Sequence, residues 1–107
     1  MCRVSSALPS GTLTAMTTIA VLGGTGPQGK GLAARWAVSG LDVVLGSRDP
    51  HRAQTAADEI GVRGAGNFDA ASQADLVLVA VPYDGHAATI AEVAPAVAGK
   101  ILIDCVN

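Results

Sequence analysis

The sequence has no run of basic residues, no cluster of cysteines and no long apolar segment. Its 107 residues carry a formal net charge of -2, and the lysines and arginines stand singly along the chain. Such scattered charges do not form the basic patch that binds nucleic acid or an anionic membrane surface. We therefore expect a small-molecule ligand and no nucleic-acid or membrane partner.

Cysteine is scarce, and its placement argues against a metal site. Cys2 and Cys105 stand at opposite ends of the chain, without a C-x-x-C pair and without a histidine at metal-ligand spacing. We interpret both as incidental thiols in a reducing cytoplasm. The apolar run in the clearest strand context, residues 76–81, is far shorter than the ~20 residues that span a bilayer.

The opening stretch also lacks a targeting signal. Residues 1–15 are interrupted by prolines, serines and a glycine, so they have no continuous apolar centre of the kind found in a signal peptide. We expect a flexible N-terminal tail over residues 1–17, or a start of translation at Met16.

From Thr18 onward, short β-branched runs alternate with alanine-rich segments of helical spacing. This alternation predicts an α/β fold. Half of the residues are apolar, so we expect one globular domain over residues 18–107. In such a doubly wound, Rossmann-type parallel sheet the expected strand order is 3-2-1-4-5. The predicted strands are 18–22, 42–45, 62–64, 76–81 and 100–104. The first predicted helix follows the glycine-rich turn at 23–29. The second begins at the Asp49-Pro50 cap and ends at Gly61. A brief helical turn capped by Asn67 comes next, and the last helix covers 87–97.

A glycine-rich turn follows the first predicted strand. Residues 24–29 spell G-x-G-x-x-G between a strand and a helix, which is the context of a dinucleotide-binding turn. Gly24 permits a tight turn, Gly26 lets a pyrophosphate approach the backbone, and Gly29 lets the helix pack close to the strand. Thr25 and Gln28 offer further hydrogen-bond donors, or simply face solvent. A purely structural turn is the alternative.

The end of the second predicted strand favours NADP over NAD. An NAD site typically has an acidic residue there, whereas this chain has Ser47 and Arg48. An arginine can hold a 2′-phosphate with its planar fork of donors, and Arg52 lies one helical turn further on. The alternative is that Arg48 pairs with Asp49 or another surface acid, and that Arg52 is only solvated.

These residues resemble a known family, the NADPH-dependent reductases of coenzyme F420, a deazaflavin. The resemblance covers Thr18 to the end of the chain. It depends on four segments, I-A-V-L-G-G-T-G with G-K-G after it, the G-S-R triplet at 46–48, V-P-Y-D-G-H at 81–86, and D-C-V-N at 104–107. It implies hydride transfer between NADP(H) and coenzyme F420.

The resemblance also implies roles for particular residues. Thr25, Ser47, Arg48 and Arg52 would contact the dinucleotide, and Pro82 and Tyr83 would lie near its nicotinamide half. Direct hydride transfer between two rings requires mainly that the protein hold the rings close together and correctly oriented, so we predict no catalytic acid or base. His86 is expected in the first turn of the last helix.

Members of the family continue into a C-terminal domain that covers the cofactor crevice. We therefore expect the chain to be a truncated enzyme whose missing part is supplied by another chain, with a homodimer as a further option. Two alternatives remain open, a stand-alone NADP-binding module without catalysis and the N-terminal domain of an imine or pyrroline-carboxylate type reductase.

Overall fold

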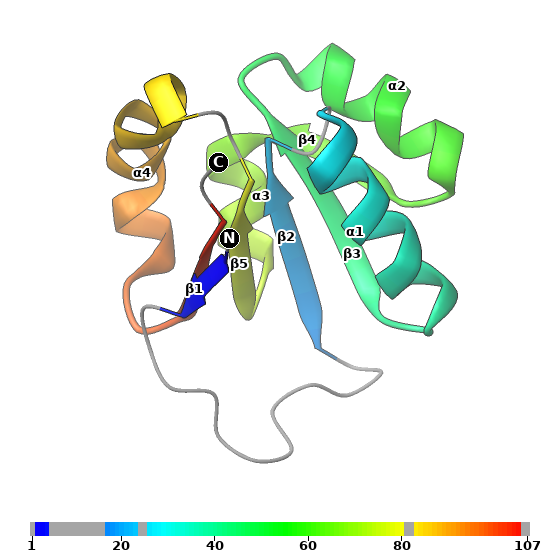
Figure 1. Cartoon of the computed structure of the whole chain (residues 1–107), viewed down its shortest axis with the longest axis horizontal. Coiled ribbons are helices and arrows are strands. Elements are labelled where there is room, and N and C mark those ends of the chain that lie inside the picture. Colours follow the sequence, from blue (N-terminus) through cyan, green and yellow to red (C-terminus); the bar gives the residue numbers. More distant parts are fainter. Residues whose placement is uncertain (1, 5–16, 24–25, 81–82, 106–107) are drawn as a thin grey trace.

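The computed structural model describes residues 2–4, 17–23, 26–80 and 83–105 (Figure 1). They form a six-stranded sheet with the order β1-β6-β5-β2-β3-β4. The five strands β2 to β6 run parallel, and β1 pairs with β6 in the antiparallel sense. The strands are β1 (Cys2–Val4), β2 (Thr18–Leu22), β3 (Asp42–Ser47), β4 (Arg63–Gly66), β5 (Leu76–Val79) and β6 (Ile101–Cys105).

The parallel part of the sheet confirms the predicted strand order. Taken in chain order, strands β2 to β6 occupy the spatial order 3-2-1-4-5. The chain leaves the β4 edge and returns beside β2 as β5, so the topological switch point lies between β2 and β5. The observed boundaries differ slightly, since β3 continues to Ser47 and β4 begins at Arg63.

Strand β1 was not predicted, because residues 1–17 were expected to form a flexible tail. Cys2 pairs with Cys105 and Val4 pairs with Ile103, so residues 2–4 extend the sheet beyond β6. Without β1, the backbone groups along the outer side of β6 would have no strand partner. A strand of three residues is too short to show a hydrophobic period, which explains why the sequence did not reveal it.

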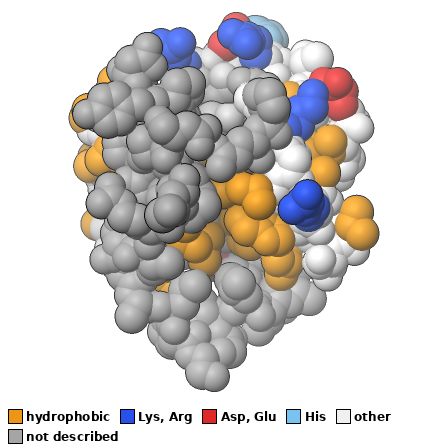
Figure 2. Space-filling view, in the orientation of Figure 1, with side chains coloured by type: hydrophobic (Ala, Val, Ile, Leu, Met, Phe, Trp, Pro, Cys, Tyr) orange, Lys and Arg blue, Asp and Glu red, His pale blue; other side chains and the backbone are white. Residues whose placement is uncertain are grey.

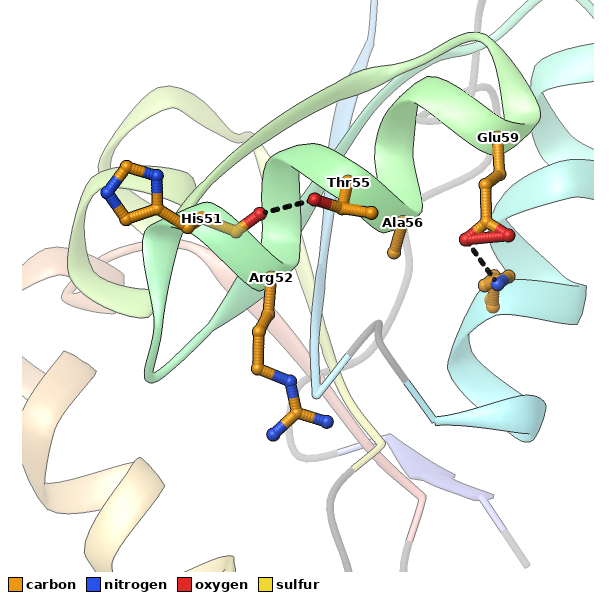
Figure 3. A pocket seen from close by; sticks show the side chains of 6 residues that line it. His51, Arg52, Thr55, Ala56 and Glu59 are labelled. Carbon is orange, nitrogen blue, oxygen red and sulfur yellow. Dashed lines mark hydrogen bonds and ion pairs between the residues drawn. The ribbon is translucent and has the colours of Figure 1, made fainter.

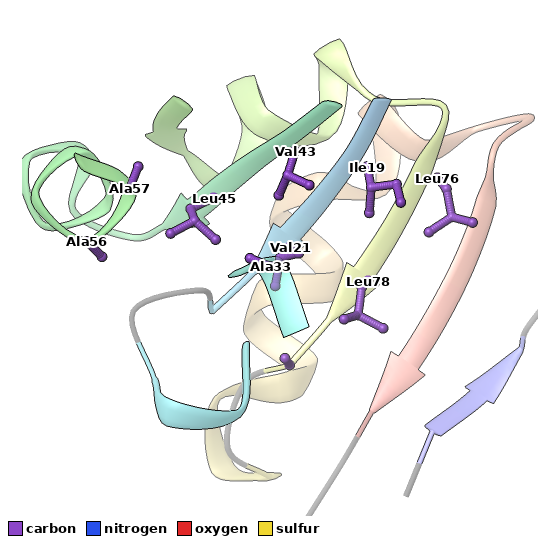
Figure 4. Packing of buried hydrophobic residues seen from close by; sticks show 10 residues of the cluster. Ile19, Val21, Ala33, Val43, Leu45, Ala56, Ala57, Leu76 and Leu78 are labelled. Carbon is purple, nitrogen blue, oxygen red and sulfur yellow. The ribbon is translucent and has the colours of Figure 1, made fainter. Parts of the chain in front are cut away.

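Helices cover both faces of the sheet, which gives three layers. The helices are α1 (Pro27–Val38), α2 (Pro50–Ile60), α3 (Asn67–Gln73) and α4 (Tyr83–Val97). Side chains of α1 and α2 pack on one face against Ile19, Val21 and Leu45 (Figure 4). Side chains of α3 and α4 pack on the other face, against Ala20, Leu22 and their neighbours.

Helix α2 begins and ends where its sequence predicted. The Asp49 side chain caps the helix by accepting a hydrogen bond of 2.9 Å from the backbone N–H of His51, and Pro50 is the first helical residue. Gly61 ends the helix with a φ of +76°, a left-handed conformation that glycine adopts without strain.

The predicted cap of the short helix α3 is wrong. Gly66 occupies the N-cap position and Asn67 is already helical, with a side chain only 2% exposed. The Oδ1 atom of Asn67 is buried without a hydrogen-bond partner. Asn67 therefore packs into the core beneath the sheet instead of turning back to cap the helix.

Polar side chains join the strands at the amino-terminal edge of the sheet. The Asp42 carboxylate accepts hydrogen bonds from the Thr18 hydroxyl (2.9 Å) and from Nη2 of Arg63 (2.8 Å). Nη1 of Arg63 donates to Gln73 of α3 at 2.9 Å. This network lies at the opposite edge of the sheet from the glycine-rich turn.

Candidate functional site

The candidate site lies at the carboxyl ends of β2 and β3, where the glycine-rich turn begins. Gly23 follows β2 with a φ of +76°. Its N–H donates to the carbonyl of Gly46 in β3 (2.9 Å), and its carbonyl accepts from the N–H of Gly26 (3.2 Å). These two hydrogen bonds tie the turn to the end of β3. A side chain at Gly23 would strain this conformation.

The N-terminus of α1 leaves room for an anionic ligand. Gly26 is the N-cap and has an ordinary extended conformation, with φ −79° and ψ 162°. Among the described residues, a Cβ on Gly26 would meet the carbonyl oxygen of Gly23 at an ordinary contact distance of 3.6 Å and no other atom within 4 Å. The fold alone therefore does not require glycine at this position. No acidic side chain in the first turn of α1 competes for the positive end of the helix dipole.

The end of β3 provides a hydroxyl group beside the turn. Ser47 is buried, and its Oγ accepts a hydrogen bond of 3.3 Å from the N–H of Asp49. Among the described residues no acceptor is found for the hydroxyl hydrogen of Ser47. A hydroxyl can donate and accept at once, so Ser47 can also donate a hydrogen bond.

Arg48 and Arg52 both lie exposed near the start of α2. Within the part of the chain that the structure describes, neither guanidinium forms an ion pair, and the two ion pairs found there are Lys30–Glu59 and Arg63–Asp42. Asp49, the acid next to Arg48, accepts its hydrogen bond from the His51 backbone as the helix cap. The alternative of an Arg48–Asp49 pair is thus not realised.

A shallow groove of about 300 Å³ runs between α1 and α2 (Figure 3). Lys30 of α1 lines one side, and Arg52 and Glu59 of α2 line the other, together with three further residues of that helix. Nζ of Lys30 lies 3.0 Å from Oε1 of Glu59. The further residues of α2 are His51, Thr55 and Ala56.

Several predicted site residues fall outside what the structure describes. Gly24, Thr25 and Pro82 are among them, as are the side chains of Gln28 and Tyr83. Gly29 is described and is buried, which agrees with close packing of α1 on the sheet.

Sequence reasoning missed two features of the site. Lys30 and Glu59 are 29 residues apart, so no local pattern joins them. The second missed feature is the packing role of Gly46. This glycine belongs to the G-S-R triplet, but close packing is sufficient to explain why the residue is a glycine. A Cβ there would lie 2.7 Å from Cδ2 of Leu22 and 2.9 Å from Oδ1 of Asn67.

No cluster of three or more metal-ligating side chains occurs among the described residues. A search of the same residues finds no helix with the length and apolar character needed to cross a membrane.

The doubly wound sheet and the glycine-rich turn at its switch point define a Rossmann-type domain. Arg48 and Arg52 are exposed close to that edge. The chain belongs to the family of coenzyme F420-dependent NADP oxidoreductases, whose model matches residues 18–107.

Individual relatives agree with this assignment. The chain is 47% identical over 95 residues to the F420-dependent NADP reductase of Methanothermobacter thermautotrophicus, an alignment that covers 80% of this chain and 41% of that protein. The chain thus spans about two fifths of the length of that relative.

Solved structures share the fold. An imine reductase from Myxococcus stipitatus, crystallised with NAD+, matches 81% of this chain and 30% of its own with a TM-score of 0.66 and 23% identity. The shikimate 5-dehydrogenase of Thermus thermophilus, crystallised with NADP(H) and shikimate, matches 67% of this chain and 27% of its own with a TM-score of 0.55 and 30% identity.

Proposed function

We propose that residues 18–107 form the NADP(H)-binding domain of an oxidoreductase that transfers a hydride between NADPH and coenzyme F420. The observation that carries the proposal is the pair of exposed guanidiniums at Arg48 and Arg52, which have no ion-pair partner among the described residues. They follow the strand end that holds the adenosine ribose in Rossmann-type domains.

The electrostatics of this strand end support NADP over NAD. A carboxylate there would accept hydrogen bonds from the ribose hydroxyls and would repel a 2′-phosphate. Asp49 is engaged in capping α2, and Ser47 retains a hydroxyl hydrogen to donate. Two arginines and one hydroxyl form a donor set that suits a dianionic phosphate.

The pyrophosphate would lie against the glycine-rich turn. The free space at Gly26 and the N-terminus of α1 fit a close approach of phosphate oxygens to backbone N–H groups. We assign cofactor contacts to the residues that the sequence motifs select, namely Gly24, Thr25, Gly26, Gln28, Gly29, Ser47, Arg48, Arg52, Pro82 and Tyr83.

The redox chemistry belongs to the two cofactors. When bound, NADPH supplies the hydride, and the deazaflavin ring of coenzyme F420 accepts it. The protein holds and orients the dinucleotide, so we assign no catalytic acid or base within this domain.

The relatives contain more than twice the matched length, so we propose that the deazaflavin site needs residues beyond this domain. A second copy or a separate chain could supply them. An NADP-dependent role of this kind also implies a cytoplasmic location.

Calorimetric titration of the 107-residue chain with NADPH and NADH tests the proposal. We expect NADPH to bind at least about tenfold more tightly, since one hydrogen bond to a charged group contributes roughly 1.5–3 kcal/mol. The preference should shrink as salt rises. Equal affinities for the two cofactors would contradict the assignment of NADP.

A second measurement separates cofactor binding from turnover. Mixing the chain with NADPH and oxidised coenzyme F420 should give no steady loss of deazaflavin absorbance. Turnover at roughly 1–1000 per second would show that this domain alone suffices, whereas binding without turnover also agrees with a stand-alone binding module.

A further inference from the structure

Two different helices would hold the pyrophosphate and the 2′-phosphate of the dinucleotide. Helix α1, with Gly26 as its N-cap, would face the pyrophosphate, whereas α2 carries Arg52 on the side of the 2′-phosphate. The distance between these groups depends on how α1 and α2 lie against each other.

Packing against the sheet anchors the inner side of α2, where the main chain of Ala53 lies close to Gly64 of β4. The two helices share one face of the sheet, but the groove of about 300 Å³ separates them on the outside. The fully buried side chains of α2 are alanines, Ile60 packs against the core while partly exposed, and Ala56 also lines the groove. No large apolar side chain is among the residues that line the groove.

Among the side chains that the structure describes, one ion pair bridges this groove. Lys30 lies in the first turn of α1, four residues after Gly26, and Glu59 lies in the last turn of α2. Arg52 and Glu59 are seven residues apart on α2, which places them about two turns from each other on one side of the helix. Figure 3 shows both side chains on the groove side of α2.

We infer that the Lys30–Glu59 ion pair is a positioning contact for cofactor selection, because it joins the outer sides of α1 and α2 and so limits how far Arg52 moves from the phosphate-binding start of α1. This inference rests on the proposed function. The two side chains are 33% and 56% exposed, so the pair contributes little to global stability. Its effect lies in alignment, because a forked arginine contact with phosphate depends on geometry.

A purely electrostatic role of Glu59 predicts the opposite sign. If Glu59 only neutralised Lys30, the substitution Glu59→Gln would free a positive charge near the phosphates and tighten NADPH binding. If the pair positions α2, Glu59→Gln should weaken NADPH binding even though it removes a negative charge.

The test compares NADPH and NADH affinities of four proteins at low salt, namely the wild type, Glu59→Gln, Lys30→Met and the double variant. We expect each single variant to lower the NADPH affinity about threefold to tenfold, part of one charge-assisted hydrogen bond, and to change the NADH affinity less than about twofold. The double variant should be no weaker than the single variants, because both remove the same contact.

Two further variants serve as controls. Lys30→Arg keeps a cation within reach of Glu59 and should retain the NADPH preference. Asp42→Asn breaks the other ion pair, at the far edge of the sheet, and should leave the ratio of the two affinities unchanged.

Each result decides between the two roles. Tighter NADPH binding by Glu59→Gln, or a ratio of NADPH to NADH affinity that stays unchanged in both single variants, would overturn the inference alone. A wild-type protein without a preference for NADPH would overturn the proposed function, and the inference with it.

Discussion

Gly64 of β4 lies against the main chain of Ala53 in α2, so closely that a Cβ on Gly64 would come within 2.5 Å of the Ala53 carbonyl oxygen. The nearest atoms all belong to the helix backbone, which cannot rotate away as a side chain can. The sheet and α2 therefore approach each other at this point through main-chain atoms.

We expect Gly64→Ala to destabilise the fold by about 1–3 kcal/mol, the usual cost of forcing an extra carbon into a packed site. Chemical denaturation followed by circular dichroism would measure it. Gly31→Ala is the matched control, because a Cβ there meets nothing within 4 Å. Within α1 this change should be neutral or stabilising by up to about 1 kcal/mol. Equal stability of the two variants would contradict the close approach.

Gly26→Val should abolish NADPH binding while the domain stays folded. The backbone at Gly26 is extended and a Cβ has room there, so the fold loses only part of its helix cap, about 1 kcal/mol. The added side chain would occupy the space in which the pyrophosphate meets the backbone. Calorimetry and thermal unfolding of the same sample check both statements, and unchanged NADPH affinity would mark the turn as purely structural.

Arg48→Glu should weaken NADPH binding far more than NADH binding, since the two cofactors differ only in the 2′-phosphate. Loss of a charged contact of roughly 1.5–3 kcal/mol corresponds to about tenfold to more than a hundredfold in affinity. The new carboxylate adds repulsion, and it also offers the ribose hydroxyls an acceptor.

Arg35→Glu is the control for net charge, because Arg35 is also exposed but lies in the last turn of α1. It should leave the ratio of the NADPH and NADH affinities near its original value. If Arg48→Glu lowered both affinities equally, Arg48 would be a structural residue and NADP would lose its main support.

Lys100→Met should lower stability without affecting the cofactor. Nζ of Lys100 donates to the carbonyl oxygens of Ala71 (2.8 Å) and Ser72 (3.0 Å) near the end of α3. Methionine keeps the apolar stem but removes the charged donor that both carbonyls share, and the Ala71 carbonyl then keeps the N–H of Ala74 (3.3 Å), so we expect a cost of about 1–2 kcal/mol. Urea denaturation would measure this cost, with Glu92→Gln on the exposed side of α4 expected within about 0.5 kcal/mol of the wild type.

Features that depend on neighbouring residues could be predicted from the sequence. The alternation of strands and helices gave the sheet order, and the Asp49-Pro50 start and the Gly61 end of α2 follow from cap chemistry. The assignment of Gly26 and Arg48 to a cofactor likewise depended on local motifs, and it stays a prediction.

Features that depend on distant residues could not be predicted. The close approach of Gly64 to Ala53 and the bridge from Lys30 to Glu59 exist only once α2 has packed beside β4 and α1. Asn67 shows the same limit, because its type and position indicated a cap while packing under Gly46 placed it in the core.

The pairing of β1 with β6 covers the outer side of β6 with the main chain of residues 2–4. A protein that began at Met16 would lack residues 2–4, and the outer side of β6 would present unpaired N–H and C=O groups to its surroundings. Such an edge is a template for strand addition by another molecule. The shortened protein should therefore self-associate at lower concentrations than the full chain does.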